Sequence, residues 1–151
     1  MAKDLDIREI ADCTCLRLRQ TTRRLTQIYD TALAPAELTI GQFGIMAHLY
    51  GLHDAPERLS VGAFAQAIGT DPTTLTRMLK PLERAGLVAD GRRAPDRRVR
   101  TLKITSKGLA KLHAAVPLWR DAQATVKKVL GAREVRALND LLDTTLTSVG
   151  A

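Results

Sequence analysis

Apolar residues recur every three or four positions along most of this chain, the spacing that places them on one face of an α-helix. Glycines, prolines and short polar segments divide the pattern into six predicted helices, at about 5–33, 40–52, 60–69, 71–86, 106–130 and 133–149. Between 99 and 105 apolar and polar residues alternate instead, and 87–90 is a second brief strand candidate, which together predict a pair of short strands. The fold class that follows is mainly α with one small β-hairpin.

The centre of the chain predicts a helix-turn-helix. Ser60 is suited to cap a short helix that Gly69 ends, and Asp71 followed by Pro72 is suited to begin a second helix. The apolar stripe of the second helix consists of Leu75, Met78, Leu79 and Leu82. Its opposite face carries threonine, arginine and lysine. This arrangement is typical of helix-turn-helix proteins, in which the second helix enters the major groove of DNA.

A β-hairpin with a basic tip follows the helix-turn-helix. The segments LVAD (87–90) and VRTLKIT (99–105) are its two predicted strands. The arginines crowded in and beside the connecting loop are Arg92, Arg93, Arg97, Arg98 and Arg100. Next to a helix-turn-helix, such a hairpin is called a wing.

The order of these elements resembles the multiple antibiotic resistance regulator (MarR) family of transcriptional regulators. The matching segments are LKPLERAGLV (79–88), Asp96-Arg97-Arg98 and LKITSKG (102–108). The resemblance extends over nearly the whole chain and implies a single domain, 1–151, that contains a winged helix-turn-helix at about 36–105. It also implies that the helical regions at about 5–34 and 106–149 interlock two copies into a homodimer.

The apolar stripes at the two ends of the chain agree with a homodimer. The predicted first and last helices carry more apolar surface than one small winged domain can cover, so part of it is expected to meet a second copy. Packing within the chain is the alternative for the first helix. A two-fold dimer places two recognition helices roughly 34 Å apart, one turn of DNA, and therefore binds a pseudo-palindromic site in double-stranded DNA.

Composition and charge support a nucleic-acid partner. The 151 residues include 23 Lys and Arg against 16 Asp and Glu, a net charge of +7. A basic balance alone also fits an ordinary basic protein, but the clustered arginines of the wing favour a polyanion. Aromatic residues make up only 3% of the chain, which argues against stacking on single-stranded bases.

The recognition helix offers five candidate DNA contacts. Thr73, Thr74 and Arg77 lie near its start, where arginine can bind guanine and threonine can touch a thymine methyl group or a phosphate. Lys80 and Arg84 lie further along and are expected to meet phosphates.

The resemblance to the MarR family implies three more candidate residues for DNA binding, in the wing. Arg98 is expected to enter the minor groove, and Arg97 adds to the positive charge of the tip. The family's Asp-x-Arg pair implies that Asp96 binds Arg98 and holds the tip in shape.

No enzyme chemistry is predicted. His48, His53 and His113 are scattered, without the spacing of metal ligands, and no phosphate loop or catalytic triad order is visible. No cofactor is expected. The first residues are charged and no apolar run reaches transmembrane length, so we expect a cytoplasmic protein with no membrane partner.

Two cysteines, Cys13 and Cys15, lie in the predicted first helix. In a continuous helix, residues two apart point about 200° apart, so this pair should not form a disulfide or hold a metal together. Peroxide sensors of the family, the organic hydroperoxide resistance regulators, carry a reactive cysteine here with a tyrosine fourteen residues on, as Cys15 and Tyr29 are spaced. Arg19 stands where those sensors have a second tyrosine. The alternative interpretation is that both cysteines are simply small apolar residues of the helix, without a redox role.

The resemblance also implies an aromatic or phenolic effector bound between the dimer layer and the winged part. Candidate pocket residues are Tyr29, Met46, Tyr50 and Trp119, with Arg17 or Arg23 for a carboxylate. The alternative is that these residues, which recur at helical spacing, belong to the hydrophobic core.

The predicted function is a homodimeric repressor released by such a ligand, with a thiol-based peroxide sensor as the alternative. A nonspecific architectural DNA-binding protein is a third hypothesis, which predicts no preference for a palindrome.

Overall fold

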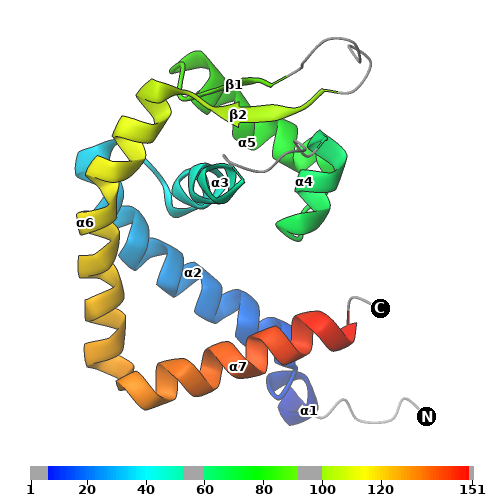
Figure 1. Cartoon of the computed structure of the whole chain (residues 1–151). Coiled ribbons are helices and arrows are strands. Elements are labelled where there is room, and N and C mark those ends of the chain that lie inside the picture. The colour runs from blue at the N-terminus through cyan, green and yellow to red at the C-terminus, as the bar shows by residue number, and fades with distance from the viewer. Residues whose placement is uncertain (1–6, 53–59, 92–99, 150–151) are drawn as a thin grey trace.

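The computed structural model describes residues 7–52, 60–91 and 100–149. Its elements in chain order are α1 (Ile7–Ala11), α2 (Thr14–Leu33), a 3-10 turn η1 (Ala34–Ala36), α3 (Ile40–Gly51), α4 (Val61–Ala67), α5 (Pro72–Arg84), β1 (Val88–Asp90), β2 (Leu102–Ile104), α6 (Ser106–Leu130) and α7 (Ala132–Val149). The predicted fold class, mainly α with a small β-hairpin, is confirmed. Figure 1 shows α3, α4, α5 and the hairpin together in one half, while α2, the lower part of α6, and α7 form the other half.

Short-range capping determines where most helices begin. Thr39 and Gln42 form the predicted capping box, with the Gln42 amide donating to the Thr39 hydroxyl at 3.2 Å and the Thr39 amide donating to Gln42 Oε1 at 2.9 Å. The predicted N-caps Ser60, Asp71 and Thr105 each accept a backbone N–H of the first turn. These helix starts were predicted from sequence, because a cap acts within three residues of itself.

The predicted single helix over 5–33 is wrong. The chain forms α1, then breaks at Asp12 and Cys13, then forms α2. Cys13 has an extended conformation (φ −61°, ψ 114°), and its amide bonds to the carbonyl of Ile10 at 3.1 Å, a tightened last turn of α1. Across the break, Arg17 donates to the Asp12 carboxylate at 2.6 Å. Apolar spacing continues on both sides, so periodicity alone missed the interruption.

One hydrophobic core holds the helix-turn-helix, the hairpin and the upper part of α6 together. Its largest fully buried side chains are Leu33, Ile45, Met46, Phe64, Leu75, Leu79, Leu82 and Val88. In the hairpin, β1 and β2 pair antiparallel with Val88 opposite Ile104, both of them buried. The recognition helix therefore rests on a packed base that fixes which of its faces is exposed.

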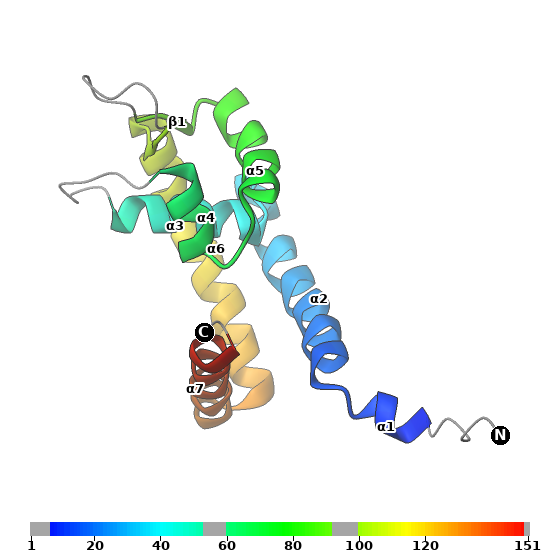
Figure 2. The same ribbon diagram turned by 90° about the vertical axis from the view of Figure 1, so that its right-hand side faces the viewer.

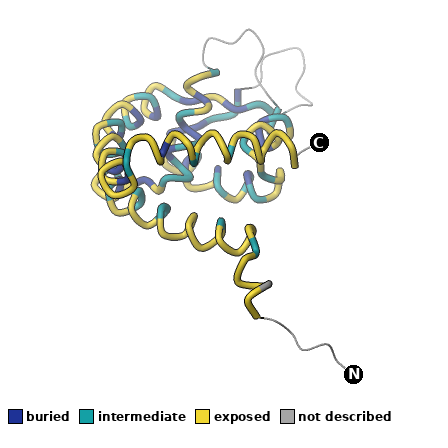
Figure 3. Tube along the Cα trace, turned by 90° about the horizontal axis from the view of Figure 1, so that it is seen from below, coloured by how far each residue is buried: buried dark blue, intermediate teal, exposed yellow. Residues whose placement is uncertain are grey.

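The other half of the molecule exposes much apolar surface. α2 packs across α6, and α7 follows from the end of α6, but Figure 2 shows α2 and α7 running apart from each other. In Figure 3 the helices near the two ends of the chain, α1 with the start of α2 and α7, are mostly exposed. The exposed large apolar residues of these helices include Ile7, Leu16, Val129, Leu141, Leu146 and Val149. None of the helices in the described ranges is long and apolar enough to cross a membrane.

Candidate nucleic-acid interface

The recognition helix α5 is held by its apolar stripe. Leu75, Leu79 and Leu82 are 0–1% exposed, so the opposite face of the helix must point to solvent. That face carries Thr73, Arg77, Lys80 and Arg84, all exposed. Figure 2 shows α5 along one side of the winged half, where no other described element covers it. A duplex can therefore approach this face without displacing the protein's own structure.

Three cations on this face have no partner among the described residues. Arg77, Lys80 and Arg84 make no ion pair or side-chain hydrogen bond within the part of the chain that the structure describes. Their spacing of three and four residues places them along one stripe of the helix. Such an uncompensated positive stripe attracts phosphates, and arginine can also bind guanine.

Thr73 and Thr74 differ in what they can offer. The Asp71 carboxylate accepts both of their backbone N–H groups at 2.9 Å. A hydrogen bond from the Thr74 side chain, then the backbone bonds, hold the pKa of Asp71 below its usual value. Thr74 is half-buried and serves the helix start, whereas Thr73 is exposed at the N-terminal end of the helix, the end that contacts base edges in helix-turn-helix proteins.

The wing is described only at its base. Gly91 N–H donates to the Thr101 carbonyl at 2.9 Å, which extends the pairing of β1 and β2 by one step. Asp96, Arg97 and Arg98 lie outside the described residues, so the predicted tip contacts stay predictions. Arg100 is described and binds Glu83 of α5. In sequence Arg100 belongs to the arginine cluster of the basic tip, and no local pattern indicated its partner 17 residues away.

The end of α5 is fastened to the start of α6. Lys107 Nζ donates to the Ala85 carbonyl at 2.7 Å, and Thr105 Oγ1 donates to the Gly86 carbonyl at 2.7 Å. Gly108 lies so close to the Leu87 carbonyl that a Cβ would fall 2.1 Å from its oxygen. The last carbonyls of the recognition-helix segment are thus bound by the helix that leads to the other half.

The candidate effector residues do not surround one cavity. Met46 is fully buried in the core, and Trp119 stacks on Phe43 with ring centroids 6.0 Å apart. The Tyr29 hydroxyl donates to Gln123 Oε1 of α6, and burial raises the pKa of Tyr29. These three side chains already have partners inside the protein.

Two further effector candidates lie apart from this group. Tyr50 is 49% exposed and meets the edge of His113, and Arg17 is exposed at the start of α2 in its ion pair with Asp12. Arg23 lines a groove on α2, described below, rather than a pocket with the aromatic residues.

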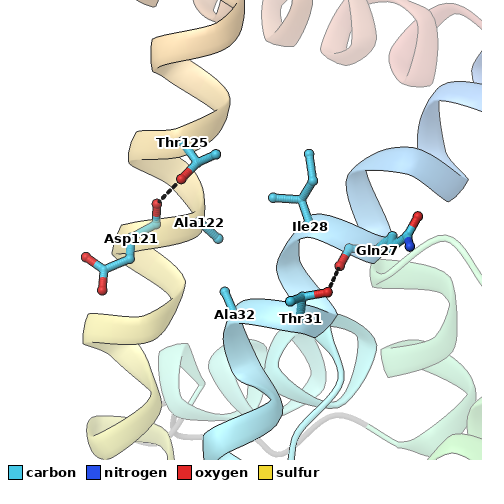
Figure 4. A pocket seen from close by; sticks show the side chains of 7 residues that line it. All are labelled: Gln27, Ile28, Thr31, Ala32, Asp121, Ala122 and Thr125. Atoms are coloured by element: carbon cyan, nitrogen blue, oxygen red, sulfur yellow. Dashed lines mark hydrogen bonds between the residues drawn. The ribbon is translucent and has the colours of Figure 1, made fainter.

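A gap between α2 and α6 was not predicted from sequence (Figure 4). It has a volume of about 470 Å³ and is lined by Gln27, Ile28, Thr31, Ala32, Asp121, Ala122 and Thr125. Thr31 and Thr125 donate their hydroxyls to carbonyls of their own helices, at 2.7 and 3.0 Å. Figure 4 shows the Asp121 carboxylate pointing away from the gap, so what faces it is mainly apolar.

The cysteines lie at the break between α1 and α2. Cys13 is half-buried immediately before α2, Cys15 is exposed in its first turn, and both are free thiols. Because no continuous helix runs through them, the helix geometry that was expected to hold the two thiols apart does not apply here. Cys15 also lines a groove of about 500 Å³ with Thr14, Leu18, Arg19, Thr22 and Arg23.

Comparisons with known proteins agree with this geometry. A sequence model of the MarR family matches residues 38–99. The Mycobacterium tuberculosis transcriptional regulator MosR is 34% identical, with a TM-score of 0.76, over 93% of this chain and 98% of that one. Its DNA complex gives 35% identity and a TM-score of 0.77, over 92% and 98%.

A second similar structure is the transcriptional repressor CouR bound to a 23-mer DNA duplex. It is 26% identical, with a TM-score of 0.72, over 99% of this chain and all of that one. The likeness to MosR includes both the winged part and the flanking helices, at an identity that goes beyond a shared fold. The chain therefore belongs to the MarR family of transcriptional regulators.

Proposed function

We propose that this protein is a homodimeric repressor that binds a pseudo-palindromic site in double-stranded DNA. The observation that carries the proposal is the exposed stripe of Arg77, Lys80 and Arg84 on a helix anchored by buried leucines. Structures of the similar regulators MosR and CouR bound to DNA support the same partner here. Thr73 and the wing arginines Arg97 and Arg98 complete the proposed contact set, with Asp96 supporting the wing.

The proposed dimer uses the helices outside the winged part. The parts at about 5–34 and 106–149 would form the interface, and the part at about 36–105 would meet DNA. Exposed apolar residues such as Leu141 and Leu146 would be covered in it. α2 exposes four arginines, while α7 exposes three acidic residues, Glu134, Asp140 and Asp143, beside two arginines, Arg133 and Arg136. A two-fold axis would use each such contact twice.

DNA binding is tested by fluorescence anisotropy with the duplex upstream of the protein's own gene. We expect tight binding to this duplex and much weaker binding to a scrambled duplex of equal length. If a dimer neutralises about six to eight phosphates, log K should fall against log salt with a slope of about −5 to −7. Sedimentation should give the mass of two chains. Equal affinity for both duplexes would support an architectural protein instead.

Release from DNA requires an effector that favours a dimer whose recognition helices no longer fit the groove spacing. The proposed effector is a small aromatic or phenolic ligand held between the dimer layer and the winged part. The apolar gap between α2 and α6 supports a ligand in this layer, because both helices also carry the proposed interface. Tyr29, the neighbour of Ile28 in sequence, does not line this gap, because its hydroxyl is bound to Gln123 of α6.

A thiol switch is the second candidate, favoured by the helix break. Cys15 is exposed at this break and Cys13 is half-buried there, and oxidation follows thiol exposure. The DNA complex should be treated in parallel with cumene hydroperoxide and with benzoate. Loss of binding with peroxide alone, abolished by Cys15→Ser, identifies a thiol-switched repressor. Loss with benzoate alone supports the ligand-released repressor and leaves the cysteines a structural role.

A further inference from the structure

Arg100 lies where the three elements of the winged half meet. Its carbonyl accepts the N–H of Val61, the first residue of α4, at 3.0 Å. The next residue, Thr101, pairs with Ser60 in an isolated β-bridge, and β2 begins directly after it. The Arg100 guanidinium forms an ion pair with Glu83, near the end of α5. One residue thus joins the first helix of the helix-turn-helix, the recognition helix and the base of the wing.

The charge of Arg100 is used within the protein. The side chains of Arg100 and Glu83 are 37% and 29% exposed, so the pair is partly shielded from water. Arg77, Lys80 and Arg84, in contrast, have no partner among the described residues. Glu83 is also the one acidic residue within α5, where a free carboxylate would repel phosphate. The ion pair neutralises the Glu83 carboxylate and occupies the Arg100 guanidinium within the protein.

We propose that Arg100 and Glu83 are positioning residues for DNA binding, rather than DNA contacts. Residues 92–99 of the wing directly precede Arg100, so the ion pair sets where the wing leaves the body relative to α5. Two contact sites held rigidly act at a high effective concentration, and a loosened connection loses part of that advantage. This inference rests on the proposed function, since it needs a duplex that meets α5 and the wing together.

The rival account makes Arg100 a phosphate contact and Glu83 an incidental neighbour. The two accounts predict opposite signs for Glu83→Gln. If the pair positions the wing, removing the carboxylate weakens binding. If Arg100 contacts phosphate, the same change removes a negative charge near DNA and frees the guanidinium, so binding becomes tighter. Arg100→Gln also distinguishes the two accounts. If Arg100 contacts phosphate, this change removes one phosphate contact in each subunit and lowers the magnitude of the salt slope by about two.

Anisotropy with the upstream duplex, over a range of salt, tests the inference in the full-length protein. We expect Glu83→Gln and Arg100→Gln each to weaken binding about tenfold with unchanged salt slopes, and the exchange of both residues, E83R with R100E, to restore most of the affinity. Glu37→Gln is the matched control, because it breaks an ion pair that does not involve α5, between Glu37 Oε2 and Lys111 Nζ at 3.1 Å. This variant should bind as the wild type does. Circular dichroism checks that each variant is folded.

Tighter or equal binding by Glu83→Gln, or a lower salt slope for Arg100→Gln, would overturn the inference while leaving the proposed function intact. If the charge exchange fails to restore affinity although the exchanged protein is folded, the direct pairing is also rejected. A wild-type protein that binds no duplex would overturn the proposed function itself, and this inference with it.

Discussion

Replacing Arg77 by alanine is expected to abolish tight binding to the preferred duplex while leaving the protein folded. Arg77 is exposed on the free face of α5, so its loss removes no packing. A forked contact to guanine contributes about 1–3 kcal/mol, and a two-fold dimer makes it twice, so we expect a loss of about 2–6 kcal/mol. The upper half of that range would bring the affinity down to that for a scrambled duplex, and anisotropy with both duplexes measures the difference.

Two matched variants show whether the loss concerns base recognition. Arg120→Ala removes an exposed arginine of α6, which belongs to the proposed dimer region but not to the proposed interface with DNA. It should leave binding unchanged as long as sedimentation still gives a dimer. Lys80→Ala should weaken binding to both duplexes alike and make the salt slope less negative, because a phosphate contact carries no sequence information. An Arg77→Ala protein that still prefers the upstream duplex by the wild-type factor would remove Arg77 from the specificity set.

Replacing Gly108 by alanine is expected to destabilise the fold by about 2–3 kcal/mol, although alanine is the better helix former. The new Cβ would lie 2.1 Å from the Leu87 carbonyl oxygen and 2.9 Å from Ile104 Cγ1. The same oxygen accepts the N–H of Thr105 at 3.0 Å. Relief of the clash therefore requires α6 to move away from the hairpin and to weaken that hydrogen bond.

Urea unfolding, followed by circular dichroism at one protein concentration, measures this effect, since a dimer's stability depends on concentration. Gly44→Ala is the matched control: it lies within α3, and its added Cβ would meet nothing within 4 Å. That variant should gain up to about 1 kcal/mol from helix propensity. Equal stability of Gly108→Ala and wild type would mean that the contact between α6 and the hairpin adjusts freely.

The sequence by itself determined most of the secondary structure. Caps at Thr39, Ser60, Asp71 and Thr105 act on neighbours within three residues, so local pattern located the starts of α3, α4, α5 and α6. The apolar stripe of α5 likewise indicated which face of the recognition helix is buried. The family resemblance extended this to the winged fold, which the comparison with MosR supports.

The tertiary structure decided which of the similar side chains are available. Arg77 and Arg100 look alike in sequence, but the tertiary structure brings Arg100 to Glu83 of α5, whereas Arg77 has no partner among the described residues. It likewise placed Met46 in the core and opened a gap between α2 and α6 that no motif marks. The apolar spacing also did not reveal the break between α1 and α2, because that spacing continues on both sides of it. Capping acts within one turn, whereas ion pairs and cavities depend on elements far apart in the chain.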